Sequence, residues 1–188
     1  METVKKDFTK AATIYKTNCD DYQFGRSCHK YAGYSFVGKG CQADQERSYD
    51  YFKRGCQLGE ADSCLNAGLM CVSKNEKNKI KTDYKGGLEF LKDACSKGNA
   101  FGCYYVSGMY ISGVPDFMEK DMTQAHGFAS RACELNEMYS CANLSRMYAR
   151  GEGVEKDEQL ADKFKLKAMD LQQQVKANQQ IRMQQGAA

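Results

Sequence analysis

The chain has 188 residues, which is room for one ordinary domain or for a short stack of repeats. Its formal net charge of +3 is too small, and its charges are too evenly spread, to indicate a nucleic-acid binder or a polybasic membrane binder. No apolar run reaches the roughly 18 residues that a membrane span needs, so no transmembrane segment is expected.

The N-terminal segment carries no recognisable targeting signal. Residues 1–16 lack the apolar centre of a secretory signal peptide. They contain lysines, but also Glu2 and Asp7 and no arginine, which is untypical of a mitochondrial presequence. The segment leaves the compartment open, because some import routes use no cleaved address.

Helical periodicity runs along most of the chain. Apolar and small residues recur at three- and four-residue steps, as in Met122, Ala125 and Phe128. Glycines such as Gly38 and Gly151 follow these segments and supply left-handed helix caps. No segment shows convincing strand alternation, so the predicted fold class is all-α. The predicted helices, about nine, lie at residues 7–19, 26–37, 44–58, 61–72, 83–97, 100–111, 121–135, 138–149 and 157–180.

The ten cysteines show that the chain is built from repeats. Eight of them form four pairs, each spanning eight or nine positions, and the pairs recur about every 38 residues. These pairs are Cys19/Cys28, Cys56/Cys64, Cys95/Cys103 and Cys133/Cys141. A period of this length is typical of solenoids made of two-helix repeats.

The repeats divide the chain into three parts. Residues 1–20 form a partial first repeat, which we read as the second helix of a unit whose first helix is missing, as in a shortened form or a fragment. Residues 21–170 form the repeat solenoid, with a lysine-rich exposed loop at 72–84. Residues 171–188 are rich in glutamine and poor in apolar residues, so we expect a polar tail that is partly disordered.

The paired cysteines are expected to form disulfides. Each pair joins the end of one helix to the start of the next, where a Cα separation near 6 Å is plausible. The alternative is a structural metal site, but the chain has no CxxC motif and its histidines are only His29 and His126. Four disulfides would in turn indicate an oxidising compartment.

Cys41 and Cys71 fall outside the repeating pairs. They are either leftover thiols or reactive thiols for disulfide exchange or haem ligation. The chain has no CxxCH motif for covalent haem attachment. We expect no cofactor and no metal, and haem is the one cofactor kept as an alternative.

The last repeat carries the clearest family resemblance. Residues 141–148 (CANLSRMY) and 151–157 (GEGVEKD) resemble the Sel-1-like repeat, and the helix-joining cysteine pairs resemble its cysteine-rich, Hcp β-lactamase-like branch. Residues 131–139 (RACELNEMY) and 113–125 (GVPDFMEKDMTQA) are similar to mitochondrial assembly factors of that branch. The resemblance implies a right-handed α-solenoid with one disulfide per repeat, in the order of pairs given above.

The resemblance also implies a function. It implies a non-catalytic scaffold of the mitochondrial intermembrane space that assembles respiratory complexes, chiefly cytochrome c oxidase and in addition complex I. Its expected partners are subunits of these complexes or their assembly factors, with the intermembrane-space disulfide relay serving import. A monomer that binds no nucleic acid is expected.

Two catalytic alternatives remain, one suggested by the unpaired cysteines and one by the bacterial members of the branch. The first is a thiol–disulfide reductase acting on the copper-delivery cysteines of the oxidase, with Cys41 and Cys71 as its thiols and haem as a bound group. The second is a β-lactamase, because residues 27–30 fit the S-x-x-K pattern formally. The S-D-N and K-T-G motifs are missing from the sequence, so we expect no β-lactamase activity.

Overall fold

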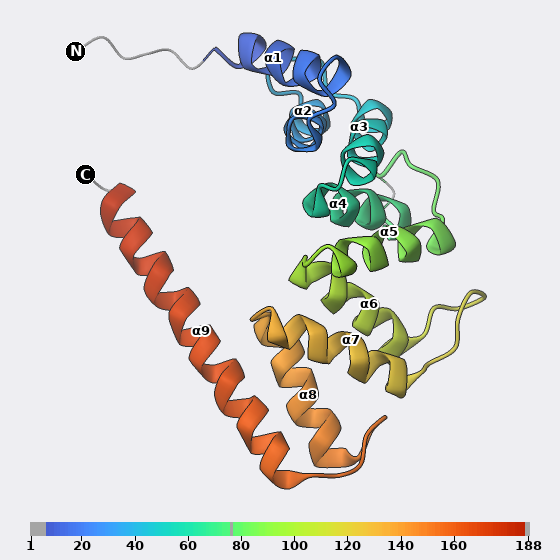
Figure 1. Ribbon diagram of the computed structural model, residues 1–188, viewed down its shortest axis with the longest axis vertical. Helices are drawn as coiled ribbons and strands as arrows, with labels where there is room; N and C mark the ends of the chain where they lie inside the picture. Colours follow the sequence, from blue (N-terminus) through green and yellow to red (C-terminus); the bar gives the residue numbers. More distant parts are fainter. Residues whose placement is uncertain (1–6, 76, 187–188) are drawn as a thin grey trace. The chain divides into compact units, whose positions relative to one another are not determined.

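A computed structural model describes residues 7–75 and 77–186 of the chain (Figure 1). These residues form nine α-helices, and their one β-bridge joins Val114 to Met118. The helices are α1 (Phe8–Asp20), α2 (Gly25–Val37), α3 (Gln45–Gln57), α4 (Ala61–Val72), α5 (Tyr84–Ser96), α6 (Ala100–Ser112), α7 (Met122–Glu134), α8 (Met138–Arg150) and α9 (Glu158–Gly186). The prediction of an all-α, disulfide-stapled solenoid is confirmed.

The chain divides into two compact units, Met1–Asn99 and Ala100–Ala188. Within each unit every helix packs on the helix that follows it. The core of the first unit contains Phe52 and Met70, and that of the second contains Leu144 and Met147, both fully buried. Each unit is therefore held together by contacts between neighbouring helices, as in other repeat proteins.

Aspartates precede the helices that carry a cysteine in their last turn. Asp7, Asp44, Asp83 and Asp121 precede α1, α3, α5 and α7, and each side chain accepts a hydrogen bond from the backbone amide three residues later. These residues have extended backbone angles and satisfy an amide that the helix leaves unpaired. The helices predicted to begin at residues 7, 44, 83 and 121 therefore begin one residue later, because each of these aspartates is the N-cap and not the first helical residue.

The N-cap can be tested at Asp121. Replacing Asp121 with alanine is expected to lower the free energy of unfolding by about 1 kcal/mol, because the amide of Gln124 loses its acceptor. Urea denaturation followed by circular dichroism measures the change. Asp121→Asn is the matched control, since asparagine caps helices equally well. An equal loss in both variants would contradict the capping role.

Helix α9 is longer than predicted. It runs from Glu158 to Gly186, whereas the sequence predicted a helix at 157–180 that frays. Glutamine, lysine and alanine are all good helix formers, so no residue in the tail stops the helix. Phe164 and Leu171 pack on the core of the second unit, while Val175 is left exposed. The partial disorder expected for 171–188 stays a prediction, and residues 187–188 lie outside the described residues.

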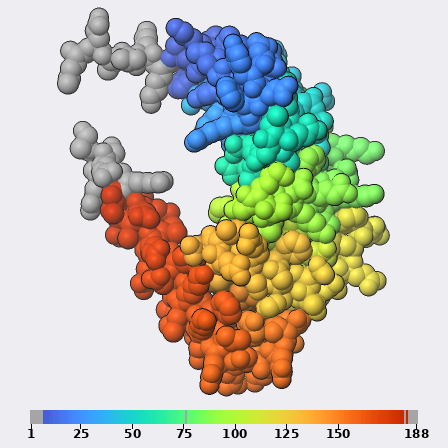
Figure 2. Space-filling view, viewed as in Figure 1, coloured from blue at the N-terminus to red at the C-terminus, as the bar shows by residue number. Residues whose placement is uncertain are grey.

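Two loops project from the helices, the green one after α4 and the yellow one after α6 (Figure 2). Most of the described residues in the loop after α4 are exposed, as predicted, but two of them are tied to the first unit. The amide of Asn78 donates to the carbonyl of Met70 at 2.6 Å, and Ile80 packs against the core of the first unit. None of the helices within the described ranges is long and apolar enough to cross a bilayer.

Candidate functional site: the disulfides and two free thiols

Disulfides join the end of one helix to the start of the next. The structure bonds Cys19 to Cys28, Cys56 to Cys64 and Cys133 to Cys141, with Cα–Cα distances of 4.8, 4.5 and 4.8 Å. These distances lie in the ordinary range for disulfides. Cys95 and Cys103 are disulfide-bonded as well.

The bonded sulfurs are shielded from solvent. All eight cysteines are buried, and none is more than 5% exposed. A dissolved thiol can attack a disulfide only where a sulfur is accessible. Burial therefore favours a structural role for these bonds over a catalytic one.

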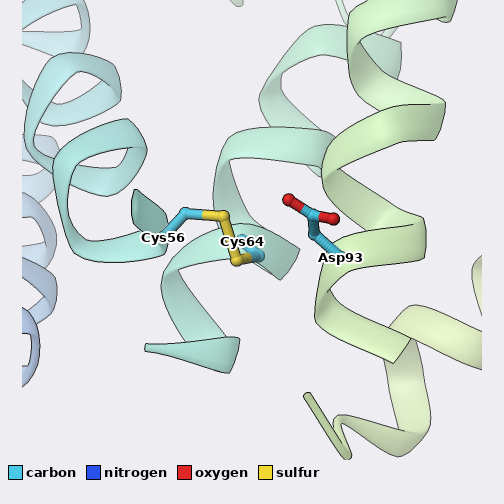
Figure 3. A group of neighbouring side chains, drawn as sticks. All are labelled: Cys56, Cys64 and Asp93. Atoms are coloured by element: carbon cyan, nitrogen blue, oxygen red, sulfur yellow. A yellow bond between two sulfur atoms is a disulfide. The ribbon is translucent and has the colours of Figure 1, made fainter. Parts of the chain in front are cut away.

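One group of side chains in the described part of the chain has the spacing of metal ligands (Figure 3). It consists of the sulfurs of Cys56 and Cys64 and a carboxylate oxygen of Asp93, all within 4.8 Å of one another. The two sulfurs are bonded to each other, so neither is the thiolate that a metal requires. The oxidised group offers a metal only the exposed carboxylate of Asp93, which forms an ion pair with the ammonium of Lys97 at 3.9 Å.

Cys71 is a free thiol at the end of α4, and it is buried. Its sulfur lies 3.1 Å from the hydroxyl oxygen of Tyr49 on α3. Burial raises the pKa of the Cys71 thiol, and the nearby carboxylate of Asp83 adds to this effect. The hydrogen bond with Tyr49 acts in the opposite direction but is outweighed. Reactive cysteines have lowered pKa values, so this environment disfavours a nucleophilic thiolate.

Cys41 is a half-buried free thiol in the turn after α2. The oxygen of Ser35 is its hydrogen-bond partner, at 3.9 Å from the sulfur. The same turn in the last repeat carries Val154, which packs against the core of the second unit. The position of Cys41 in the repeat is therefore one that an apolar side chain also fills. The structure brings Cys41 and Cys71 to different partners rather than to each other.

Both histidines have protein partners. A ring nitrogen of His29 lies 3.3 Å from the hydroxyl of Ser63, and one of His126 lies 3.1 Å from the hydroxyl of Tyr148. Burial lowers the pKa of both imidazoles. Neutral histidines with hydrogen-bond partners fit a packing role.

The contact between Tyr49 and Cys71, which the sequence did not predict, has an equivalent in the last repeat. Cys71 lies seven residues after Cys64, and Tyr148 lies seven residues after Cys141. Each contacts the residue 22 positions earlier, Tyr49 in one case and His126 in the other. Aligning the repeats would have shown that Cys71 takes the place of a tyrosine that packs between helices.

The two free thiols should react at different rates. We expect iodoacetamide to label Cys41 at least tenfold faster than Cys71 in the folded protein at pH 8, because Cys71 is buried and its pKa is raised. Peptide mapping at successive times measures both rates. In denaturant the rates should converge. Equal labelling of the folded protein would contradict the buried position of Cys71.

Comparison with known proteins identifies the repeats. Residues 25–60, 100–137 and 139–161 match the Sel1 repeat family. A solved Sel1 repeat protein from Oxalobacter formigenes has the same fold, with a TM-score of 0.73 over 89% of this chain and 64% of that chain, at 17% identity.

Curated relatives cover nearly the whole chain. The cytochrome c oxidase assembly factor 7 homolog of Drosophila melanogaster is 41% identical over 94% of this chain and 79% of its own length. The cytochrome c oxidase assembly factor 7 of Xenopus tropicalis is 38% identical over 96% of this chain and 80% of its own. The chain therefore belongs to the Sel1 repeat proteins and, within them, to the cytochrome c oxidase assembly factor 7 family.

Proposed function

We propose that the chain is a non-catalytic scaffold for assembly of the mitochondrial respiratory chain, chiefly of cytochrome c oxidase and in addition of complex I. The observation that carries this proposal is the 41% identity, over 94% of the chain, to a relative named as an oxidase assembly factor. Its partners are subunits of these complexes or their other assembly factors, and it acts as a monomer.

The structure supports a binding role. The disulfides fix the turn between paired helices, and two buried serines hydrogen-bond within the repeats, Ser48 to the carbonyl of Ala32 at 2.9 Å and Ser107 to that of Ala125 at 2.9 Å. Rigid helix pairs of this kind hold a constant surface toward a partner, which is how other solenoid proteins bind theirs.

The intermembrane space is the proposed compartment. Disulfides persist in oxidising compartments and are rare in reducing ones. Entry through the intermembrane-space disulfide relay would oxidise the cysteine pairs during import. Protease treatment of intact and swollen mitochondria tests the compartment: the protein should be protected in the first and digested in the second. Protection in both would place the protein in the matrix and contradict the proposal.

The thiol–disulfide reductase with bound haem is not favoured by the environment of its candidate thiols. Cys71 is buried with a raised pKa, and Cys41 has a serine hydroxyl as its partner. A reductase needs an accessible thiolate beside a resolving thiol. We therefore propose the scaffold in preference to the enzyme.

Gene deletion and rescue test the scaffold directly. Deletion is expected to lower cytochrome c oxidase activity and the amount of assembled complex on native gels, with a smaller loss of complex I. The wild-type chain and the double variant Cys41→Ser/Cys71→Ser should both restore assembly. Rescue by the wild type alone, with the double variant present at normal abundance, would favour the reductase. Normal oxidase levels after deletion would refute the assembly role.

A further inference from the structure

The first unit contains a groove between α2 and α4 with a volume of about 690 Å³. We call it the α2–α4 groove; its apolar lining is formed by Phe36, Val37, Phe52, Leu69 and Met70. Phe36 and Val37 are 45% and 67% exposed, although both are large apolar side chains. The volume falls in the range of clefts that bind ligands or peptide side chains.

A glycine keeps one wall of the groove open. Gly33 lies inside α2, and a Cβ atom placed on it would meet nothing within 4 Å. Packing therefore does not require glycine here, and glycine is a weaker helix former than alanine. The missing side chain leaves space in the groove that the fold itself does not fill.

Among the described residues, the rim of the groove offers hydrogen-bond donors and the positive charge of one lysine. Lys77 lines it and is exposed, and Gln45 and Asn75 lie beside it. The side-chain oxygens of Gln45 and Asn75 accept from the backbone amides of Lys79 and Lys77, at 2.8 and 3.0 Å. Their amide groups remain to donate to a ligand. Among the described residues that line the groove, none is aspartate or glutamate.

We propose that the α2–α4 groove binds a segment of a partner protein that carries a bulky apolar side chain and, within one or two residues, a carboxylate. The apolar side chain packs between Phe36 and Leu69 over Gly33, and the carboxylate accepts from Lys77 and the neighbouring amides. A single lysine is too little charge for a nucleic-acid backbone, whereas it suits one carboxylate. This inference deepens the assembly role and rests on it only for the identity of the partner.

Selection from a random peptide library displayed on phage, against the purified full-length oxidised protein, tests the groove. The enriched peptides should share an apolar residue next to an acidic one. Fluorescence polarisation with the strongest of them should show that Gly33→Phe weakens binding by roughly tenfold or more. The matched control is Gly127→Phe, since Gly127 also lies inside a helix with nothing within 4 Å but lines no part of the groove.

A charge reversal makes the test independent of the effect of Gly33→Phe on folding. Lys77 is exposed in a loop, so Lys77→Glu should leave the fold intact. It should weaken the binding of acidic peptides and strengthen the binding of basic ones. The proposal is overturned if enriched peptides bind Gly33→Phe as tightly as wild type, if they are basic, or if none is enriched. It is also overturned if vesicles of phosphatidylserine, rather than peptides, bind in a Lys77-dependent manner. The peptide-binding assay needs no oxidase, so its result is independent of the gene-rescue experiment. A failed selection would overturn the groove proposal alone, and a failed rescue would overturn the assembly role alone.

Discussion

Replacing Gly153 with alanine is expected to lower the free energy of unfolding by about 2 to 5 kcal/mol. Gly153 has a φ of +74°, a left-handed conformation that alanine adopts only with strain. An added Cβ would also clash with the carbonyl oxygen of Met122, closer than real Cβ atoms are found. The turn after α8 and the start of α7 would therefore have to separate.

Urea denaturation followed by circular dichroism measures this effect, and Gly59→Ala is the matched control. Gly59 has a φ of +88° but no atom within 4 Å of an added Cβ, so it isolates the backbone strain. That strain is expected to contribute only about 1 to 2 kcal/mol. Equal losses in the two variants would show that the contact with Met122 does not matter. Gly40 makes the same approach to the carbonyl of Phe8 in the first unit, so its alanine variant should behave like Gly153→Ala.

The second large effect is expected from removing one disulfide. The double variant Cys133→Ala/Cys141→Ala should lose about 2.5 kcal/mol, because closing a loop of about nine residues restricts the unfolded chain by that amount. Both cysteines are buried at the turn between α7 and α8, so the loss of packing around the sulfurs adds to it.

The shift of the urea midpoint measures this loss, with Cys41→Ala as the control because that cysteine is free. The control should change the midpoint little. Adding a reductant in denaturant should destabilise the wild type more than the double variant, which has one disulfide fewer to lose. Coincident midpoints for the wild type and the double variant would show that the disulfide between α7 and α8 does not stabilise the fold.

The repeat architecture was readable from the sequence because it depends on local signals that recur. The cysteine spacing, the apolar periodicity and the glycines after helices located every helix to within about two residues, apart from the end of α9. The remaining differences lie at the helix ends, where cap residues continue the apolar and polar pattern of a helix without being helical. The aspartates are N-caps, and the C-caps of α3, α5 and α7 are Leu58, Lys97 and Leu135.

The contacts between repeats were not readable in the same way. That Asp93 would lie beside the Cys56–Cys64 disulfide depends on how consecutive helices pack, and no local pattern reports it; the contact of Cys71 with Tyr49 emerges only when the repeats are aligned. The α2–α4 groove also depends on packing, because its lining comes from three helices and a loop. The sequence placed Cys41 and Cys71 outside the repeating pairs, but it did not predict that Cys71 is buried with a raised pKa.

Counting thiols in protein taken from its native compartment tests the central claim most directly. The protein is alkylated in denaturant, before and after reduction, and its intact mass is measured. A disulfide-stapled solenoid in an oxidising compartment predicts two tags before reduction, mapped to Cys41 and Cys71, and ten after it, one for each cysteine of the chain. Ten tags before reduction would mean a reducing compartment, and would contradict both the disulfides and the intermembrane-space scaffold.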